Sequence, residues 1–185
     1  MGYVKFIEDK YLFLFFIYFM LPSSALYAET ISLKDNLIFT GELVKEPCEL
    51  DINSSEINVE FGTIPDKYLY KYSKTHSQSF TIRLLSCDIS ISDQVQVMFS
   101  GDESNELPGF LKVSSGPASG IAIGLEDENG DAVSINKLTP KAKLGTGTNL
   151  LNFRAFVQAE PSAINYRTVR YGDFKAVTTF EIEYP

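Results

Sequence analysis

Two cysteines are the first residues whose type and spacing could do chemistry. Cys48 and Cys87 lie 39 positions apart, and neither belongs to a CxxC or CxxH motif. Zinc sites and redox-active thiols usually show such short spacings, so metal ligation by this pair is the less favoured interpretation. In an oxidising compartment the pair predicts one disulfide bond. On the chain-entropy model, closing a loop of this length stabilises a fold by roughly 4 kcal/mol.

A second candidate is the acidic segment 126–131, which reads Glu-Asp-Glu-Asn-Gly-Asp. Its alternating oxygen atoms are typical of a calcium-binding loop, but the bidentate glutamate of the EF-hand spacing does not follow downstream. The Asn129-Gly130 pair is also the dipeptide that two-residue hairpin turns favour. The sequence therefore predicts a hairpin turn, with calcium binding as the alternative, and we assign no metal site.

The residues needed for catalysis are sparse. The one histidine, His76, lies in a polar stretch without a neighbouring cysteine or aspartate, so we expect it in a solvated loop. A hydrolase built on carboxylates such as Asp51 or Asp127 stays open as a hypothesis, although no spacing pairs them. The alternating tyrosines of 68–72 favour packing at a sheet edge, with sugar or protein contact as the alternative. We therefore predict no enzyme, no catalytic residue and no cofactor.

Composition and charge narrow the class of partner. The 185 residues are 44% hydrophobic and 22% charged, which is enough apolar content for the core of one domain. The formal net charge is -8. Nucleic-acid binders and proteins that bind anionic membranes need clustered Lys and Arg, so this charge argues against both classes. We expect neutral or proteinaceous partners.

The N-terminus predicts export. Residues 11–21 form an apolar run of the length of a signal-peptide core, and small residues follow it. We expect residues 1–28 to be a signal peptide that is cleaved after Ala28, with cleavage after Ala25 or an uncleaved anchor as alternatives. Export places the cysteines in an oxidising compartment, and after cleavage no membrane segment is expected.

The remaining chain predicts an all-β fold. Short runs rich in β-branched and aromatic residues alternate with Gly, Pro, Asn and Asp in turn-like spacers, and no helical period competes. Their number favours a β-sandwich. The expected strands are 37–44, 57–61, 79–86, 94–100, 110–114, 121–126, 132–135, 150–158 and 174–184.

The two ends alternate most regularly between apolar and polar residues, which is the period of a half-buried strand. Near the N-terminus one row is apolar except for Asp35, and near the C-terminus one row is almost entirely hydrophobic. An edge strand of this kind must be covered or left open. The N-terminal row holds Ile31, Leu33, Asp35, Leu37 and Phe39, and the C-terminal row holds Phe174, Ala176, Thr178, Phe180, Ile182 and Tyr184.

Several motifs in this order resemble one known family. They are 39–48 (FTGELVKEPC), 59–62 (VEFG), 80–87 (FTIRLLSC), 99–101 (FSG), 107–109 (LPG), 120–125 (GIAIGL), 153–157 (FRAFV) and Gly172 before an alternating strand with a penultimate Tyr184. Together they are similar to the subunits of chaperone–usher pili, and closest to minor tip subunits of the P-pilus type. The resemblance covers nearly all the chain after residue 28.

The resemblance implies a fold and a mode of assembly. The fold is an incomplete immunoglobulin-like β-sandwich that lacks its final strand and carries an N-terminal donor-strand extension, at 29–40, before a pilin domain at 41–185. A periplasmic pilus chaperone, and later the extension of a neighbouring pilus subunit, supplies the missing strand, and an outer-membrane usher exports the fibre to the cell surface. Within this scheme Asp35 stands where the family often has a small residue, which leaves the register of the donor strand open.

We therefore expect a structural minor subunit of a fimbrium that supports cell adhesion by donor-strand exchange. The extension would donate the row that ends at Phe39, and the C-terminal strand from Gly172, with Phe174, Phe180, Ile182 and Tyr184, would border the acceptor groove and contact the chaperone. The alternatives are a self-contained, lectin-like carbohydrate-binding sandwich and the hydrolase above. The disulfide is expected to join the first expected strand to the third.

Overall fold

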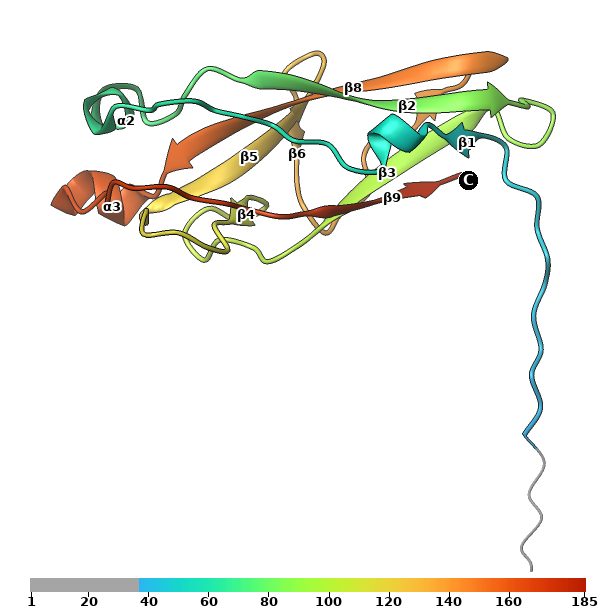
Figure 1. The fold of residues 1–185 in the computed structure, drawn as a ribbon, viewed down its shortest axis with the longest axis horizontal. Helices are drawn as coiled ribbons and strands as arrows, with labels where there is room; N and C mark the ends of the chain where they lie inside the picture. The colour runs from blue at the N-terminus through green and yellow to red at the C-terminus, as the bar shows by residue number, and fades with distance from the viewer. Residues whose placement is uncertain (1–36) are drawn as a thin grey trace, which may run out of the picture. The chain divides into compact units, whose positions relative to one another are not determined.

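The computed structural model describes residues 37–185, and its strands form two antiparallel sheets (Figure 1). Leu43–Pro185 form one compact unit, separate from the residues up to Glu42. The larger sheet has six strands in the order β1 (Glu49–Leu50), β2 (Gln78–Cys87), β8 (Gly147–Ala159), β5 (Ile121–Asp127) and β4 (Leu111–Lys112), with β6 (Ala132–Val133) beside β5. The smaller sheet has the order β7 (Ala142–Lys143), β3 (Gln94–Ser100) and β9 (Thr179–Glu183).

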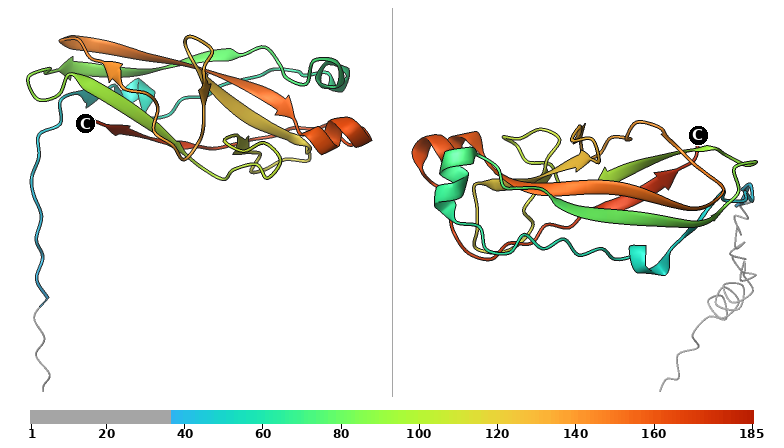
Figure 2. Two further views of the ribbon diagram at one scale, coloured as in Figure 1. Left: turned by 180° about the vertical axis from the view of Figure 1, so that it is seen from behind. Right: turned by 90° about the horizontal axis from the view of Figure 1, so that it is seen from above.

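Alternation of side chains explains which strands face the core. In β3 every second residue is buried, as expected of a strand with one covered face. In β5 six successive residues are buried, because β8 lies on one edge, β4 and β6 on the other, and side chains cover both faces. Figure 2 shows β2 and β8, the two longest strands, side by side along the larger sheet.

Three phenylalanines join the two sheets at the centre of the core. Phe80 on β2 and Phe153 on β8 come from the larger sheet, and Phe99 on β3 comes from the smaller one. The ring of Phe99 meets that of Phe153 edge to face, with 5.1 Å between centroids, and Phe99 is almost fully buried. Edge-to-face pairs add to the stability gained by burial, so this cluster fixes the two sheets against each other.

Short helices interrupt the strands. They are the 3-10 helix η2 (Ile52–Ser54) and the α-helices α2 (Asp66–Tyr72) and α3 (Pro161–Tyr166). Helices α2 and α3 lie together at one end of the unit, and β1 and the C-terminus lie at the other end (Figure 1). Within residues 37–185, no helix has the length and apolar content needed to cross a membrane.

Most of the expected strands are confirmed, and two are wrong. The runs at 79–86, 94–100, 121–126 and 150–158 correspond to β2, β3, β5 and β8, while those at 110–114, 132–135 and 174–184 contain the shorter β4, β6 and β9. No strand forms over 37–44 or over 57–61, because neither segment has a strand beside it to bond. The tyrosines of 68–72, expected at a sheet edge, lie instead on α2.

The disulfide forms as expected between Cys48 and Cys87. The expectation that it joins the first expected strand to the third is wrong, because Cys48 directly precedes β1 and Cys87 ends β2. The bond therefore fastens two neighbouring strands of the larger sheet. It also anchors the start of the compact unit, where residues 37–46 are exposed and Pro47 and Cys48 are buried.

Candidate strand-binding site

Strand β9 has a free edge. It pairs with β3 on one side and is the last strand of its sheet. Val97 on β3 directs both its backbone groups away from β9, since its N–H donates to the Thr139 hydroxyl and its carbonyl accepts from the Thr139 N–H. Antiparallel pairs alternate between bonded and non-bonded, so Ile182, opposite Val97, directs its own N–H and carbonyl to the free edge. The same holds for Phe180, opposite Phe99.

The residues whose backbone groups face the free edge also carry the inward side chains. Along 174–184 half-buried residues alternate with exposed ones, which confirms the predicted face. The half-buried hydrophobic residues pack on the core but are not closed over by it. These residues are Phe174, Ala176, Phe180, Ile182 and Tyr184. A strand added at this edge would thus find backbone partners and a partly exposed apolar surface at the same positions.

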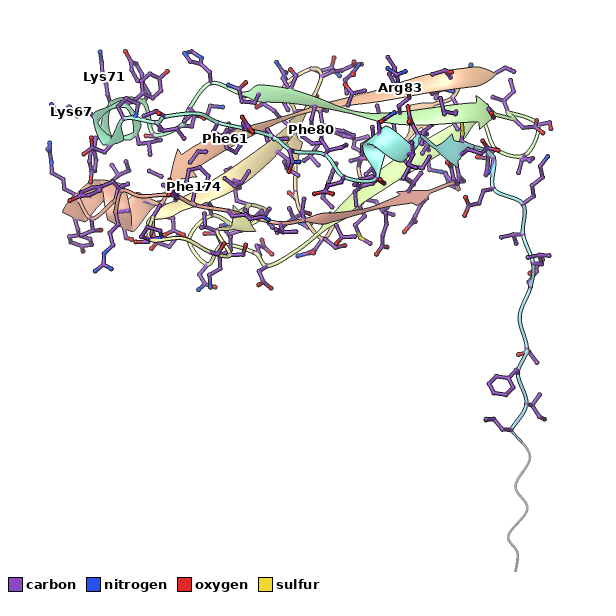
Figure 3. All side chains as sticks on the ribbon, in the orientation of Figure 1. Phe61, Lys67, Lys71, Phe80, Arg83 and Phe174 are labelled. Atoms are coloured by element: carbon purple, nitrogen blue, oxygen red, sulfur yellow. A yellow bond between two sulfur atoms is a disulfide. The ribbon has the colours of Figure 1, made fainter. Side chains whose placement is uncertain are left out.

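A second unpaired segment borders this surface. Ile57, Val59 and Phe61 are half-buried and alternate with exposed residues, but in the described part of the chain no backbone–backbone hydrogen bond involves residues 56–64. The ring of Phe61 stacks on that of Phe174 with 6.1 Å between centroids, so the two segments lie side by side at this point (Figure 3). The sequence predicted a strand here; the side chains alternate as in a strand, and the missing element is the partner strand.

Gly172 lets the chain enter this edge. Its φ of 137° lies in the region that glycine favours, and a Cβ atom there would collide with the ring of Pro117. The next residue, Asp173, accepts a hydrogen bond of 3.3 Å from the Ala118 N–H. Gly172 therefore fixes where the segment leaves the loop at 115–119 and starts toward β9.

At the other end of the edge, Tyr184 meets a negative charge. Burial raises the pKa of its phenol above the ordinary value, and the Glu46 carboxylate raises it further. Glu46 lies two residues before the disulfide, so the disulfide end of the unit places an acidic group beside the last inward side chain of the edge.

The residues from 37 to the start of the compact unit at Leu43 present an exposed apolar row. Leu37 and Phe39 are 79% and 85% exposed, and Leu43 is fully exposed. Gly41 stands between them on the same row, with open space where a Cβ would lie. The exposed row therefore continues beyond the predicted boundary at residue 40. The other predicted donor residues, Ile31, Leu33 and Asp35, and the predicted signal peptide at 1–28 lie outside the described residues.

The weaker sequence candidates are explained by local structure. The Asp127 carboxylate accepts hydrogen bonds from the backbone N–H groups of Asp131 and Asn129, and these bonds lower its pKa. The predicted hairpin turn between β5 and β6 is thereby confirmed, with Gly130 at a φ of 95°. Among residues 37–185 no group of three or more His, Cys, Asp or Glu side chains has the arrangement of a metal site.

Asp51 and His76 also have structural partners. Asp51 caps η2 through the Asn53 N–H, and its carboxylate lies 3.7 Å from the Arg83 guanidinium. His76 is exposed, as expected, and its Nε2 atom lies 3.0 Å from the Tyr68 hydroxyl. The two carboxylates named in the hydrolase hypothesis, Asp51 and Asp127, therefore accept hydrogen bonds from a helix start and a turn.

Comparisons with known proteins agree on one family. A family model described as "Fimbrial protein" matches residues 37–185. The chain is 32% identical over 146 residues to the Fimbria A protein of Serratia marcescens, covering 79% of this chain and 82% of that protein. It is 32% identical over 161 residues to the fimbrial adapter PapK of Escherichia coli, covering 83% and 89% respectively.

Solved structures agree on the fold. The P pilus rod subunit PapA superposes with a TM-score of 0.67 at 23% identity, covering 76% of this chain and all of that one. A subunit in the structure of a chaperone–usher pilus gives the same TM-score at 23% identity and covers 82% of this chain. The immunoglobulin-like sandwich expected from the sequence is therefore confirmed.

Proposed function

The chain belongs to the fimbrial protein family, and on the geometry of its free edge we propose that it assembles by exchanging strands with neighbouring subunits. It is a component of surface fimbriae of the chaperone–usher type, as its sequence motifs indicated. The observation that carries the proposal is the free edge of β9, whose backbone groups and inward apolar side chains occur at the same residues. The exposed apolar row at 37–43 is the matching donor.

The geometry of the edge defines which side chains of a paired donor strand would point inward. Phe180 and Ile182 present backbone groups to the edge and side chains to the core, so a bonded donor residue would direct its own side chain inward beside them. A strand donating Leu37, Phe39 and Leu43 inward would bury three large side chains. At about 1.5 to 3 kcal/mol each, they would contribute about 4.5 to 9 kcal/mol before the cost of ordering the donor.

Both halves of the exchange are present in this subunit, which supports an internal position in the fibre. In a fibre joined by strand exchange, the subunit at one end needs only an acceptor and the subunit at the other end needs only a donor, whereas every subunit between them needs both. We assign the chain to the minor subunits because of its likeness to the adapter PapK, with which it shares 32% identity over most of both chains. We expect residues 1–28 to be removed on export and 29–40, extended to Leu43, to form the donor.

The partners follow from the same edge. A periplasmic chaperone would cover β9 until the donor of a neighbouring subunit replaces it, because a free apolar edge invites aggregation. An outer-membrane usher would export the growing fibre. A self-contained lectin-like module is not favoured, since the relatives are fimbrial subunits and adapters. Membership of this family supports a structural rather than an enzymatic role.

A peptide of residues 29–44 tests the proposal. The full-length chain, refolded in the presence of this peptide, should bind it, melt at a higher temperature and cease to self-assemble. A chain that lacks 29–44 should bind the same peptide but form no polymers, since it keeps only the acceptor. If the shortened chain polymerises like the full-length one, or if the peptide does not bind, strand exchange through β9 is refuted.

A further inference from the structure

The end of the unit formed by α2 and α3 is rich in basic residues although the chain carries a net charge of -8. Lys67 and Lys71 lie on α2 and point away from the sheets (Figure 3). Three more basic residues follow the two helices, and all five are exposed. We call this set the basic end: Lys67, Lys71, Lys74, Arg167 and Arg170.

The basic end has no carboxylate partner of its own. None of the ion pairs found among residues 37–185 includes any of its five side chains. Three of them lie instead over aromatic rings. The Lys71 ammonium is 4.8 Å from the centre of Tyr72, the Lys74 ammonium is 4.5 Å from that of Phe156, and the Arg167 guanidinium is 5.6 Å from that of Tyr70. Such contacts hold the side chains in place without neutralising their charge, so the surface is both positioned and positive.

The acidic residues at this end do not cancel its positive charge. Segments 65–76 and 160–172 carry the five basic residues against two acidic ones, Asp66 and Glu160. The carboxylate of Asp66 accepts the Lys67 N–H, and that of Glu160 accepts the Ser104 hydroxyl. Glu106 reaches the start of α3 and Asp173 follows Gly172, so four acidic residues stand against the five basic ones and the balance remains positive.

The opposite end of the unit is acidic. Segment 42–49, which we call the acidic stem, holds Glu42, Glu46 and Glu49 against Lys45 alone, and Lys45 is already 3.5 Å from Asp88. Glu183 lies at the same end, where β9 finishes (Figure 1). The segment 174–184, which contains β9, therefore runs from the positive end of the unit to the negative end.

We infer that the basic end is a docking surface for the acidic stem of the copy of this chain that donates its strand. The inference rests on the proposed function. In a donor strand, the acidic stem begins at Glu42 and continues past the last residue of the apolar row, Leu43. If the donor runs antiparallel to β9, its stem emerges beyond Phe174, against the basic end. A parallel donor would bring the stem to Glu46 and Glu183, where like charges repel.

Charge thus does two things in this interface. It selects the direction in which the donor enters, because only one direction pairs opposite signs. It also speeds the approach of the donor, since the basic end attracts the stem before any strand pairing forms. Both effects concern exposed groups, so both weaken as salt shortens the Debye length.

The test uses a labelled peptide of residues 29–49, with Cys48→Ser, binding to the full-length chain. We compare the wild type with Lys67→Glu/Lys71→Glu at about 20 mM and about 500 mM salt, the conditions between which screening becomes strong. At low salt the variant should bind the peptide about tenfold more slowly, within the range known for electrostatic steering, and at high salt the two should converge. A peptide with Glu42→Lys and Glu46→Lys should restore fast binding to the variant.

A matched control separates this surface from net charge. Lys137→Glu/Lys141→Glu changes the total charge equally, on exposed residues of the loop beyond the other edge of β3, and should bind the peptide like the wild type. Circular dichroism should show that both variants fold. If the wild type and the α2 variant bind at equal rates at low salt, or if the charge-swapped peptide restores nothing, the docking inference is overturned while peptide binding itself still supports strand exchange. A peptide that binds none of the chains refutes the proposed function instead.

Discussion

Replacing Leu37 and Phe39 together by alanine should abolish assembly without weakening the subunit itself. Both side chains are about four-fifths exposed in the isolated chain, so truncating them removes little that the monomer buries. Exposed substitutions of this kind usually change the free energy of unfolding by no more than about 0.5 kcal/mol. The double variant should therefore melt at nearly the wild-type temperature.

The double substitution should instead reduce the free energy of binding between subunits. If the two side chains enter the surface beside β9, each contributes about 1.5 to 3 kcal/mol of burial, or about 3 to 6 kcal/mol together. Because about 1.4 kcal/mol corresponds to a tenfold change in affinity, the double variant should bind a neighbouring subunit roughly 10² to 10⁴ times more weakly. Polymers should then be absent at concentrations where the wild type assembles.

Ile38 supplies the matched control, because it is 79% exposed like Leu37 but lies between the two donor residues. In an extended strand its side chain points to the opposite face, so Ile38→Ala should assemble almost normally. Size-exclusion chromatography and thermal melting of all variants measure both quantities. Equal loss of assembly in Ile38→Ala would show that the predicted face is wrong. Unfolding of the double variant would show that 37–43 belongs to the subunit's own sheet.

Three further outcomes follow from the geometry. Hydrogen exchange at the Phe180 and Ile182 amides should be fast in the free chain and slow once the 29–44 peptide binds, whereas the alternate amides bonded to β3 should be protected in both states, as NMR would show. Cys48→Ser should lower the free energy of unfolding by about 4 kcal/mol in denaturant titrations, since it opens a loop of 39 residues. Hydrogen bonds from the Ser162 hydroxyl and N–H lower the pKa of Glu106 below its ordinary value of 4.5. These bonds therefore stabilise the folded state above pH 4.5, and this stabilisation is lost as the pH falls through the lowered pKa. Glu106→Gln should reduce the loss of unfolding free energy between neutral and acidic pH in denaturant titrations.

The sequence predicted the long strands well, because their alternation is sustained and local. β3 matched the expected 94–100, and β2, β5 and β8 differed by a few residues at their ends. Two of the two-residue strands, β1 and β7, escaped prediction, since they are defined by pairing with a neighbour and carry no pattern of their own.

The short helices were missed for a different reason. With seven and six residues, α2 and α3 are too short to show a helical period. The tyrosines at 68, 70 and 72 alternate as a strand would, but Pro65 precedes the segment and Asp66 lies in its first turn, which are signals of a helix start. The rings of Tyr68 and Tyr72 then meet on one face of the helix, tilted by 44° with 4.6 Å between their centroids. Those start signals could have identified α2.

The two expected strands that do not form show that alternation in a sequence does not by itself predict backbone pairing. Segment 57–61 has the half-buried alternation of a strand but no backbone partner, and 37–43 has exposed apolar residues with nothing to cover them. Alternation reports which face a side chain takes, whereas a strand exists only when another strand supplies its hydrogen bonds. Strand β9 keeps backbone groups and apolar side chains free along one edge. Each of the three is half of a strand pairing, so a pattern that is incomplete in one subunit is what a fibre completed by its neighbours requires.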